Sequence, residues 1–384
     1  MFRSRERRRI YMDYASTTPT DPRVLEAMLP YFGDRFGNAA SLHSWGMEAR
    51  EALEKAREEI ASFIRASPME LIFTSSATES NNLAIKGAAF ASRGKGRNII
   101  TSRIEHPSVL EPCRWLERNG FEVTYISVDK HGLVDPAKVE EEIREDTILV
   151  SIMHANNEIG TIEPIREIGE ICGERGVLFH VDAAQSLGKI PVDVEEMGVD
   201  LLTLSGHKIY GPKGIGALYV REGVEIEPLL HGGGHEYGLR SSTVNIPGAV
   251  GFAKACELMR DLMEEEAERL GRLCRKLIEE ISEIDGVHLT GHPEKRLPTI
   301  ASFWLEFIEG ERLILELNER GIAASIGSAC ASGKLEPSHV LLAIGLNEDR
   351  ARRGLRLSIG RWTRRGEVEY VIEALREIAG KYAK

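Results

Sequence analysis

The spacing of hydrophobic and polar residues changes repeatedly between about residues 47 and 220. Short apolar runs, typical of buried strands, alternate with segments whose apolar residues recur at helical spacing. The expected strands are residues 71–74, 98–101, 122–126, 147–153, 177–181, 200–204 and 215–220, and the expected helices are 47–65, 79–91, 107–119, 136–144 and 164–174. This alternation predicts an α/β fold with a largely parallel sheet.

The C-terminal third has a different pattern. Residues 246–283 carry apolar positions at helical spacing among many Glu and Arg residues, which predicts one long helix. Strands are then expected at 287–289, 299–304 and 356–359, and a last helix at 367–382. Because 384 residues are enough for two domains, we expect a large domain at 18–255 and a smaller α+β domain formed by 1–17 and 256–384.

Composition narrows the class of protein. The chain is 42% hydrophobic and 28% charged, as in ordinary globular proteins, and apolar runs such as 148–153 are too short to cross a bilayer. A formal net charge of −11 disfavours binding to nucleic acid or anionic lipid. Five cysteines without a C-x-x-C pair argue against a disulfide framework. We therefore expect a cytoplasmic protein that binds no membrane and no nucleic acid directly.

Ligands of open α/β sheets bind beyond the carboxyl ends of the strands, so polar residues there are candidate site residues. Residues 75–79 (Ser-Ser-Ala-Thr-Glu) follow one strand and open a helix, where backbone N–H groups and the helix dipole suit a phosphate. An ordinary helix cap is the alternative. Asp182 and Gln185 follow another strand, and a buried carboxylate needs a cation such as a protonated pyridine nitrogen.

The strongest indication of a cofactor is Ser205-Gly206-His207-Lys208, which follows the strand at 200–204. A lysine beside a hydroxyl and an imidazole suits a Schiff base to an aldehyde cofactor whose phosphate those neighbours bind; a surface lysine is the alternative. His106 suits stacking on a flat ring and proton transfer near neutral pH. Asn157 suits a hydrogen bond to a phenolic oxygen, and a role in a turn explains it equally well.

Cys330 differs from the other four cysteines, which lie in helical patterns. Its surroundings, at about residues 326–335, contain many small residues and little apolar content, which predicts a mobile loop. A cysteine on such a loop suits a nucleophile that reaches a buried substrate and then carries its cargo away. An incidental exposed cysteine is the alternative.

Together these motifs resemble the cysteine desulfurases, a group of class V aminotransferases among the fold-type I pyridoxal-phosphate enzymes. The resemblance extends from residue 11 to residue 361. Residues 77–80, 180–182, 205–208 and 210–214 look like the family's cofactor signature, and residues 327–330 with 335–341 look like the longer cysteine loop of the subgroup that supplies iron–sulfur cluster assembly. Two positions depart from the family pattern: Ser76 replaces a usual glycine and Ala39 a usual proline.

The resemblance implies a fold-type I transferase with a mostly parallel seven-stranded sheet and a role for each matching residue. Lys208, Cys330 and His106 would be catalytic. The residues expected at pyridoxal 5'-phosphate are Ala77, Thr78, His106, Asn157, Asp182, Gln185, Ser205, His207, Lys208 and Thr243. Thr243 would reach the phosphate from the second subunit of a homodimer. Arg356 and Asn38 would bind the substrate, and Cys330 is also a candidate transient ligand of an iron–sulfur cluster.

The implied reaction removes sulfur from L-cysteine and leaves L-alanine and a persulfide on Cys330. The sulfur would pass to an iron–sulfur scaffold protein or to another acceptor, and tRNA thiolation is a second process that could use it. Three alternatives stay open: another class V aminotransferase acting on a small amino acid, a selenocysteine lyase, and a sulfur-relay or scaffold-binding protein without turnover. Normal turnover in a Cys330→Ser variant would favour the aminotransferase, and absence of a Schiff-base absorbance would favour the relay protein.

Overall fold

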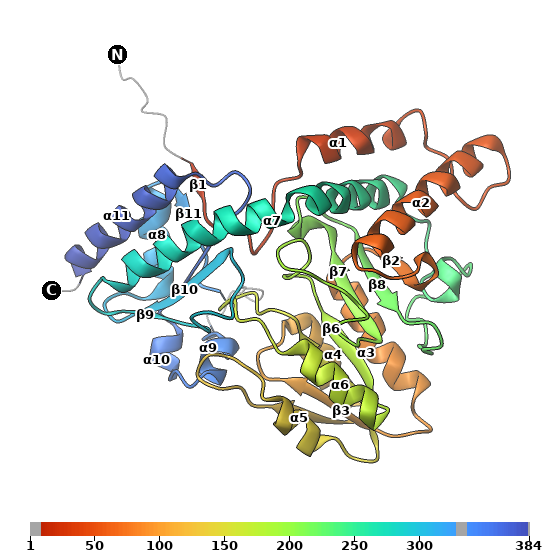
Figure 1. The fold of residues 1–384 in the computed structure, drawn as a ribbon, viewed down its shortest axis with the longest axis horizontal. Coiled ribbons are helices and arrows are strands. Elements are labelled where there is room, and N and C mark those ends of the chain that lie inside the picture. Colours follow the sequence, from red (N-terminus) through yellow and green to blue (C-terminus); the bar gives the residue numbers. More distant parts are fainter. Residues whose placement is uncertain (1–8, 328–335, 383–384) are drawn as a thin grey trace.

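The computed structural model describes residues 9–327 and 336–382, and its centre is a sheet of seven strands in the order β2-β8-β7-β6-β5-β3-β4 (Figure 1). These strands are β2 (Leu71–Thr74), β3 (Asn98–Ser102), β4 (Glu122–Ile126), β5 (Thr147–Met153), β6 (Leu178–Asp182), β7 (Leu201–Ser205) and β8 (Gly216–Val220). Neighbouring strands pair in parallel except on the two sides of β8. The predicted α/β fold with a mostly parallel seven-stranded sheet is confirmed.

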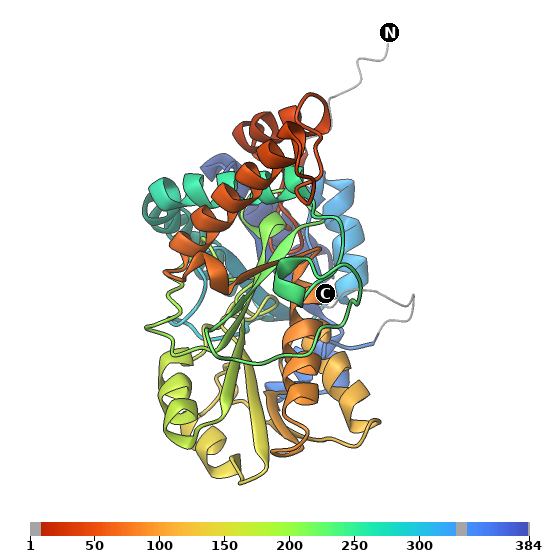
Figure 2. The same ribbon diagram turned by 90° about the vertical axis from the view of Figure 1, so that its right-hand side faces the viewer.

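Helices cover both faces of this sheet, and Figure 2 shows them as layers on opposite sides. On one face lie α3 (Ala77–Ala91) and α4 (Pro107–Glu117), whose apolar residues share a core with alternate strand residues. On the other face lie α2 (Ser44–Phe63), α5 (Pro136–Glu142), α6 (Ile165–Arg175) and the first half of α7 (Ile246–Ser282). Because both faces are buried, the strands read as continuous apolar runs.

Several boundaries differ from the expected ones by one to three residues, for local reasons. Helix α2 begins at Ser44 because Nδ1 of His43 accepts the N–H of Gly46, a cap that apolar spacing does not reveal. Helix α3 begins at Ala77 because the Ser76 side chain accepts the N–H of Glu79. Strand β6 continues to Asp182, which pairs with Met153 of β5.

The second half of α7 belongs to a separate hydrophobic core (Figure 1). This core includes the antiparallel sheet β12-β10-β9 and the parallel pair β1-β11. Its elements are β1 (Ile10–Tyr11), β9 (Val287–Leu289), β10 (Ile300–Leu305), α8 (Gly310–Glu319), β11 (Ile322–Ala323), β12 (Gly354–Ser358) and α11 (Arg365–Tyr382). The short helices α1 (Pro22–Met28), α9 (His339–Ala343) and α10 (Glu348–Ala351) complete the fold. The domain limits 18–255 and 256–384 stay predictions.

Residues 328–335, which include Cys330, lie outside the described part of the chain. The predicted loop at 326–335 and the roles given to Cys330 therefore stay predictions. Within residues 9–327 and 336–382, no helix combines the length and the apolar character needed to span a membrane.

Candidate active site

A cavity of about 360 Å³ lies where the carboxyl ends of the central strands meet strand β12 of the three-stranded sheet. Its lining comes from segments far apart in the chain, because each strand end delivers its own polar residues to this edge of the sheet. Ten of the predicted site residues line the cavity: Ala77, Thr78, His106, Asn157, Asp182, Gln185, Ser205, His207, Lys208 and Arg356.

One end of the cavity is built to hold an anion. The first turn of α3, with Ala77 and Thr78, presents backbone N–H groups that have no partner within the helix. Oγ of Ser205 is buried there and has no hydrogen-bond partner. A side chain at Gly216 would lie 2.7 Å from the backbone of Ser76, so glycine lets β8 approach the start of α3. These groups suit a phosphate.

His207 lies at the same end of the cavity and acts as a neutral group. Its Nδ1 is 3.0 Å from Oγ1 of Thr17. Burial lowers the pKa of His207 to about 4, and the nearby Lys208 adds to the effect. The imidazole therefore contributes a hydrogen bond near neutral pH rather than a charge.

Asp182 lines the cavity from the end of β6 and is 6% exposed. Its Oδ2 accepts a hydrogen bond from Nδ2 of Asn81 at 2.7 Å, and its Oδ1 accepts the N–H of Ala184 at 2.9 Å. Both donors are neutral. A buried carboxylate with neutral donors is stabilised by a cation brought in with a ligand, and a protonated ring nitrogen has that charge.

Lys208 points into the cavity from the segment that follows β7. Its Nζ donates to the carbonyl oxygens of Ala15, at 2.5 Å, and Ser16, at 2.8 Å. Burial, with a further contribution from Arg356, lowers the pKa of Lys208 to about 8. A substantial share of the amine is therefore neutral near physiological pH, as nucleophilic attack on an aldehyde requires.

His106 begins α4 and is held by Ser108. Nδ1 of His106 accepts the backbone N–H of Ser108 at 3.1 Å and lies 2.8 Å from the Ser108 hydroxyl. Because Nδ1 is an acceptor, the neutral ring carries its proton on Nε2. Burial lowers the pKa of His106 by more than the negative charge of Asp182 raises it. The neutral form therefore prevails near pH 7.

Arg356 reaches the cavity from β12 and is almost fully buried. Its Nη2 donates to Oδ1 of Asp13 and Oγ of Ser16, and its Nη1 donates to the carbonyl oxygen of Asn157. Its buried Nε has no partner. A guanidinium fixed in this way suits binding of a carboxylate.

Two predicted residues do not line the cavity. Asn38 and Thr243 are exposed, and Oδ1 of Asn38 accepts the N–H of Ala40. Their assigned roles stay predictions. Conversely, sequence reasoning missed the carbonyl of Ala15, the hydroxyl of Ser16 and the side chain of Asn81. A main-chain carbonyl has no sequence signature, whereas Asn81 stands one turn after Thr78 on the same helix.

Comparison with known proteins agrees with this arrangement. Residues 10–371 match the family described as aminotransferase class-V. The chain belongs to this family. It is also 52% identical over 365 residues to the protein named cysteine desulfurase IscS 1 of Archaeoglobus fulgidus, covering 95% of each chain. The match to cysteine desulfurase IscS of Dictyoglomus turgidum is 50% over 376 residues, covering 98% of this chain and 95% of that protein.

Solved structures are also similar to this chain. A NifS-like protein superimposes with a TM-score of 0.92 at 40% identity, covering 97% of this chain and 100% of its own. The structure titled SspA in complex with cysteine gives a TM-score of 0.82 at 42% identity, covering 91% and 98%. The resemblance to the cysteine desulfurases is thus confirmed, and with it the fold-type I class and dependence on pyridoxal phosphate.

Proposed function

We propose that this chain is a cysteine desulfurase that converts L-cysteine to L-alanine and carries the sulfur as a persulfide on Cys330. The observation that supports this most is the composition of one cavity. It contains an amine with a lowered pKa on Lys208, the buried carboxylate of Asp182, a neutral imidazole on His106 and a buried guanidinium on Arg356.

The residues present fit pyridoxal phosphate. The first turn of α3, Ser205 and His207 would hold the phosphate, for which the unpartnered Oγ of Ser205 is a ready donor. Asp182 would pair with the ring nitrogen, and Asn157 and Gln185 would lie near the phenolic oxygen. When bound, this cofactor supplies a protonated ring that withdraws electrons from the substrate carbon and so eases the breaking of its bonds.

Side chains of the protein would bind the substrate, transfer the proton and attack the sulfur. Arg356 would bind the substrate carboxylate, and Lys208 would take and return a proton at the substrate carbon, because its pKa of about 8 lies close to working pH. The Cys330 thiolate would attack the substrate sulfur, forming an S–S bond while the C–S bond breaks and its electron pair passes to carbon. L-Cysteine and a thiol thus become L-alanine and a persulfide.

The other cysteines do not compete with Cys330 for this role. Cys113, Cys172, Cys256 and Cys274 are all buried and none forms a disulfide. Burial raises the pKa of Cys172 to about 12 and that of Cys274 to about 11, and it raises the pKa of the other two as well. Since only a thiolate attacks sulfur efficiently, these four thiols are unreactive near neutral pH.

We infer that the enzyme works as a homodimer in the cytoplasm and delivers sulfur to an iron–sulfur scaffold protein or another acceptor. Large apolar side chains are about half exposed or more in the segment 25–47, which includes the end of α1 and the start of α2: Leu25, Leu29, Phe32, Phe36, Leu42, Trp45 and Met47. Such a concentration is typical of a surface that a partner covers. Thr243 is exposed, as a residue that reaches the site of a second subunit must be.

The test is release of alanine and sulfide from L-cysteine in the presence of a reductant. Cys330→Ala should abolish sulfide release and keep the cofactor absorbance, whereas Lys208→Ala should lose both the covalent cofactor band and the activity. Cys172→Ala, a buried cysteine in α6, is the matched control and should keep both. Normal turnover by Cys330→Ala would refute the persulfide mechanism and favour an aminotransferase or lyase.

A further inference from the structure

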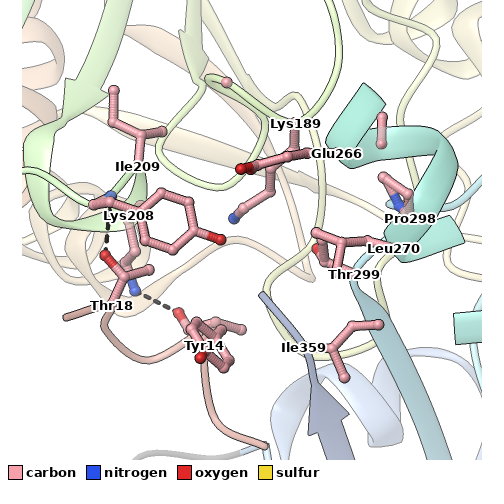
Figure 3. A pocket seen from close by; sticks show the side chains of 14 residues that line it. Tyr14, Thr18, Lys189, Lys208, Ile209, Glu266, Leu270, Pro298, Thr299 and Ile359 are labelled. Carbon is pink, nitrogen blue, oxygen red and sulfur yellow. Dashed lines mark hydrogen bonds between the residues drawn. The ribbon is translucent and has the colours of Figure 1, made fainter. Parts of the chain in front are cut away.

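A second lysine lies beside the catalytic one. Lys189 follows β6 in the turn region at 183–189 and, with Lys208, lines a small pocket next to the main cavity (Figure 3). Its Nζ donates to the backbone oxygen of Gln185 at 2.8 Å and to the side-chain Oε1 of the same residue at 2.9 Å. The side-chain carbonyl of Gln185 is therefore occupied by an amine.

This contact decides which end of the Gln185 amide faces the site. With Oε1 bound to Lys189, the NH₂ group points the other way, and Nε2 donates to the carbonyl oxygen of Ala15 at 2.8 Å. The same carbonyl accepts the hydrogen bond from Nζ of Lys208. A continuous set of hydrogen bonds thus runs from Lys189 through Gln185 to the oxygen shared with Lys208.

We propose that Lys189 is a positioning residue that holds Oε1 of Gln185 so that the Gln185 amide always presents its NH₂ group to the cofactor oxygen. This inference rests on the proposed cofactor site. Without Lys189, only the bond from Nε2 to the carbonyl oxygen of Ala15 opposes a rotation of the amide that presents Oε1 instead. An acceptor facing a phenolate oxygen would repel it, whereas a donor stabilises it.

The charges around Lys189 are consistent with this role. Glu266 lines the same pocket as Lys189 (Figure 3), but its Oε1 accepts a hydrogen bond from Nε of Arg361 at 2.5 Å. The other nearby charges, Lys208 and Arg356, are positive. Burial, followed by these two cations, lowers the pKa of Lys189 to about 7. Both its neutral and charged forms carry N–H groups, so the hold on Oε1 persists through this titration.

The experiment is a pH titration of the absorbance of the cofactor-loaded protein without substrate. In Lys189→Met, loss of a donor to the phenolate should raise the midpoint of the cofactor band by about one pH unit, since one unit equals about 1.4 kcal/mol. Lys189→Arg keeps a donor and should shift the midpoint by less than half as much. Lys254→Met, which removes a lysine on α7 that is paired with Glu257, should leave the midpoint unchanged.

A double-mutant cycle separates positioning from a general structural effect. Because Lys189 is inferred to act through Gln185, Lys189→Met should add no shift in a Gln185→Leu background. An unchanged midpoint in Lys189→Met, or the same shift in both backgrounds, would overturn the inference. The titration needs no turnover, so it gives its answer even if the chain releases no sulfide from cysteine and the proposed function fails.

Discussion

Asn81 donates a hydrogen bond from Nδ2 to Oδ2 of Asp182 at 2.7 Å, and a second from the same nitrogen to Oγ of Ser108 at 2.8 Å. Asn81 lies on α3, whose first turn forms the anion-binding end of the cavity, whereas Asp182 ends β6. Ser108 in turn contacts the ring of His106. One buried amide thus links the phosphate end of the site to its central carboxylate and to His106.

Replacement of Asn81 by alanine should therefore weaken both the fold and the cofactor site. We expect a loss of about 1.5–3 kcal/mol in the free energy of unfolding, as for other hydrogen bonds to charged groups, and about a tenfold rise in the cofactor dissociation constant. Denaturant unfolding with and without cofactor, and equilibrium dialysis, measure the two effects. Asn82→Ala, at a half-buried position whose side chain donates only to the Thr78 carbonyl of the same helix, should change neither; equal effects of both substitutions would contradict the prediction.

The sequence located most of the site because parallel strands end at one edge. Asp182, Ser205 and Lys208 each follow an apolar run, and that position alone brings them together. Asn81 lies inside a helix, where spacing shows only that one face is buried, so its contact with Asp182 depends on how α3 packs against β6. Arg356 comes from β12, whose apolar residues belong to the second hydrophobic core, and its place in the cavity followed only from the family resemblance.

Prediction of the fold from the sequence was limited in the same way. Apolar runs of four residues or more identified all seven central strands, whereas the two-residue strands β1 and β11 were missed because they are too short to form such a run. The amphipathic helix α8 was also missed. These elements are stabilised by the second core, which joins residues from both ends of the chain, such as Ile10 and Ile322. Contacts at such separation follow from packing rather than from local spacing.

The lowered pKa of Lys208 predicts the pH dependence of cofactor uptake. Only the neutral amine attacks an aldehyde, so the uptake rate of the cofactor-free protein should rise about tenfold per pH unit below pH 8 and level off above it. This midpoint follows from burial and from the charge of Arg356, which together lower the pKa of Lys208 to about 8. Stopped-flow absorbance measures the rate. A rate that still climbs steeply beyond pH 9.5 would mean that the amine has an ordinary pKa.

The buried carboxyl group of Glu105 should make the stability of the folded protein depend on pH. It is fully buried, its Oε1 accepts hydrogen bonds from Ser102 and the N–H of Met153, and its Oε2 has no partner. Burial raises its pKa to about 8. The folded state therefore binds a proton that the unfolded state releases above about pH 4.5, so this group's contribution to stability falls as pH rises from about 4.5 to about 8.

Glu105→Gln removes this titration and places an N–H₂ group where Oε2 has no partner. As pH rises from 5 to 8, the unfolding free energy of the parent should fall relative to that of the variant by on the order of 3 kcal/mol. Urea unfolding at several pH values is the measurement. Glu142→Gln, an exposed glutamate at the end of α5, is the control and should run parallel to the parent. A difference between Glu105→Gln and the parent that is constant with pH would show that Glu105 is not the titrating group.

The exposed apolar segment 25–47 predicts how the two subunits of the proposed homodimer contact each other. Phe36 is 71% exposed, and a charge placed there would have to be desolvated if a second copy covers the segment. Phe36→Asp should therefore yield monomers in analytical ultracentrifugation. Leu315→Asp is a matched control, because Leu315 on α8 is 64% exposed and lies outside this segment. Dimers that withstand Phe36→Asp, or that dissociate equally in Leu315→Asp, would place the interface elsewhere.

The shared site itself can be tested by mixing two defective proteins. If each site combines Lys208 of one subunit with Thr243 of the other, a heterodimer of Lys208→Ala and Thr243→Ala chains contains one site with both residues intact and one with neither. Random exchange of subunits should then restore about a quarter of the sites, although a Lys208→Ala homodimer has none. Sulfide release by the mixture, after subtraction of the residual activity of Thr243→Ala alone, measures this. If Thr243 served its own chain, every heterodimer site would lack one of the two residues and mixing would restore nothing.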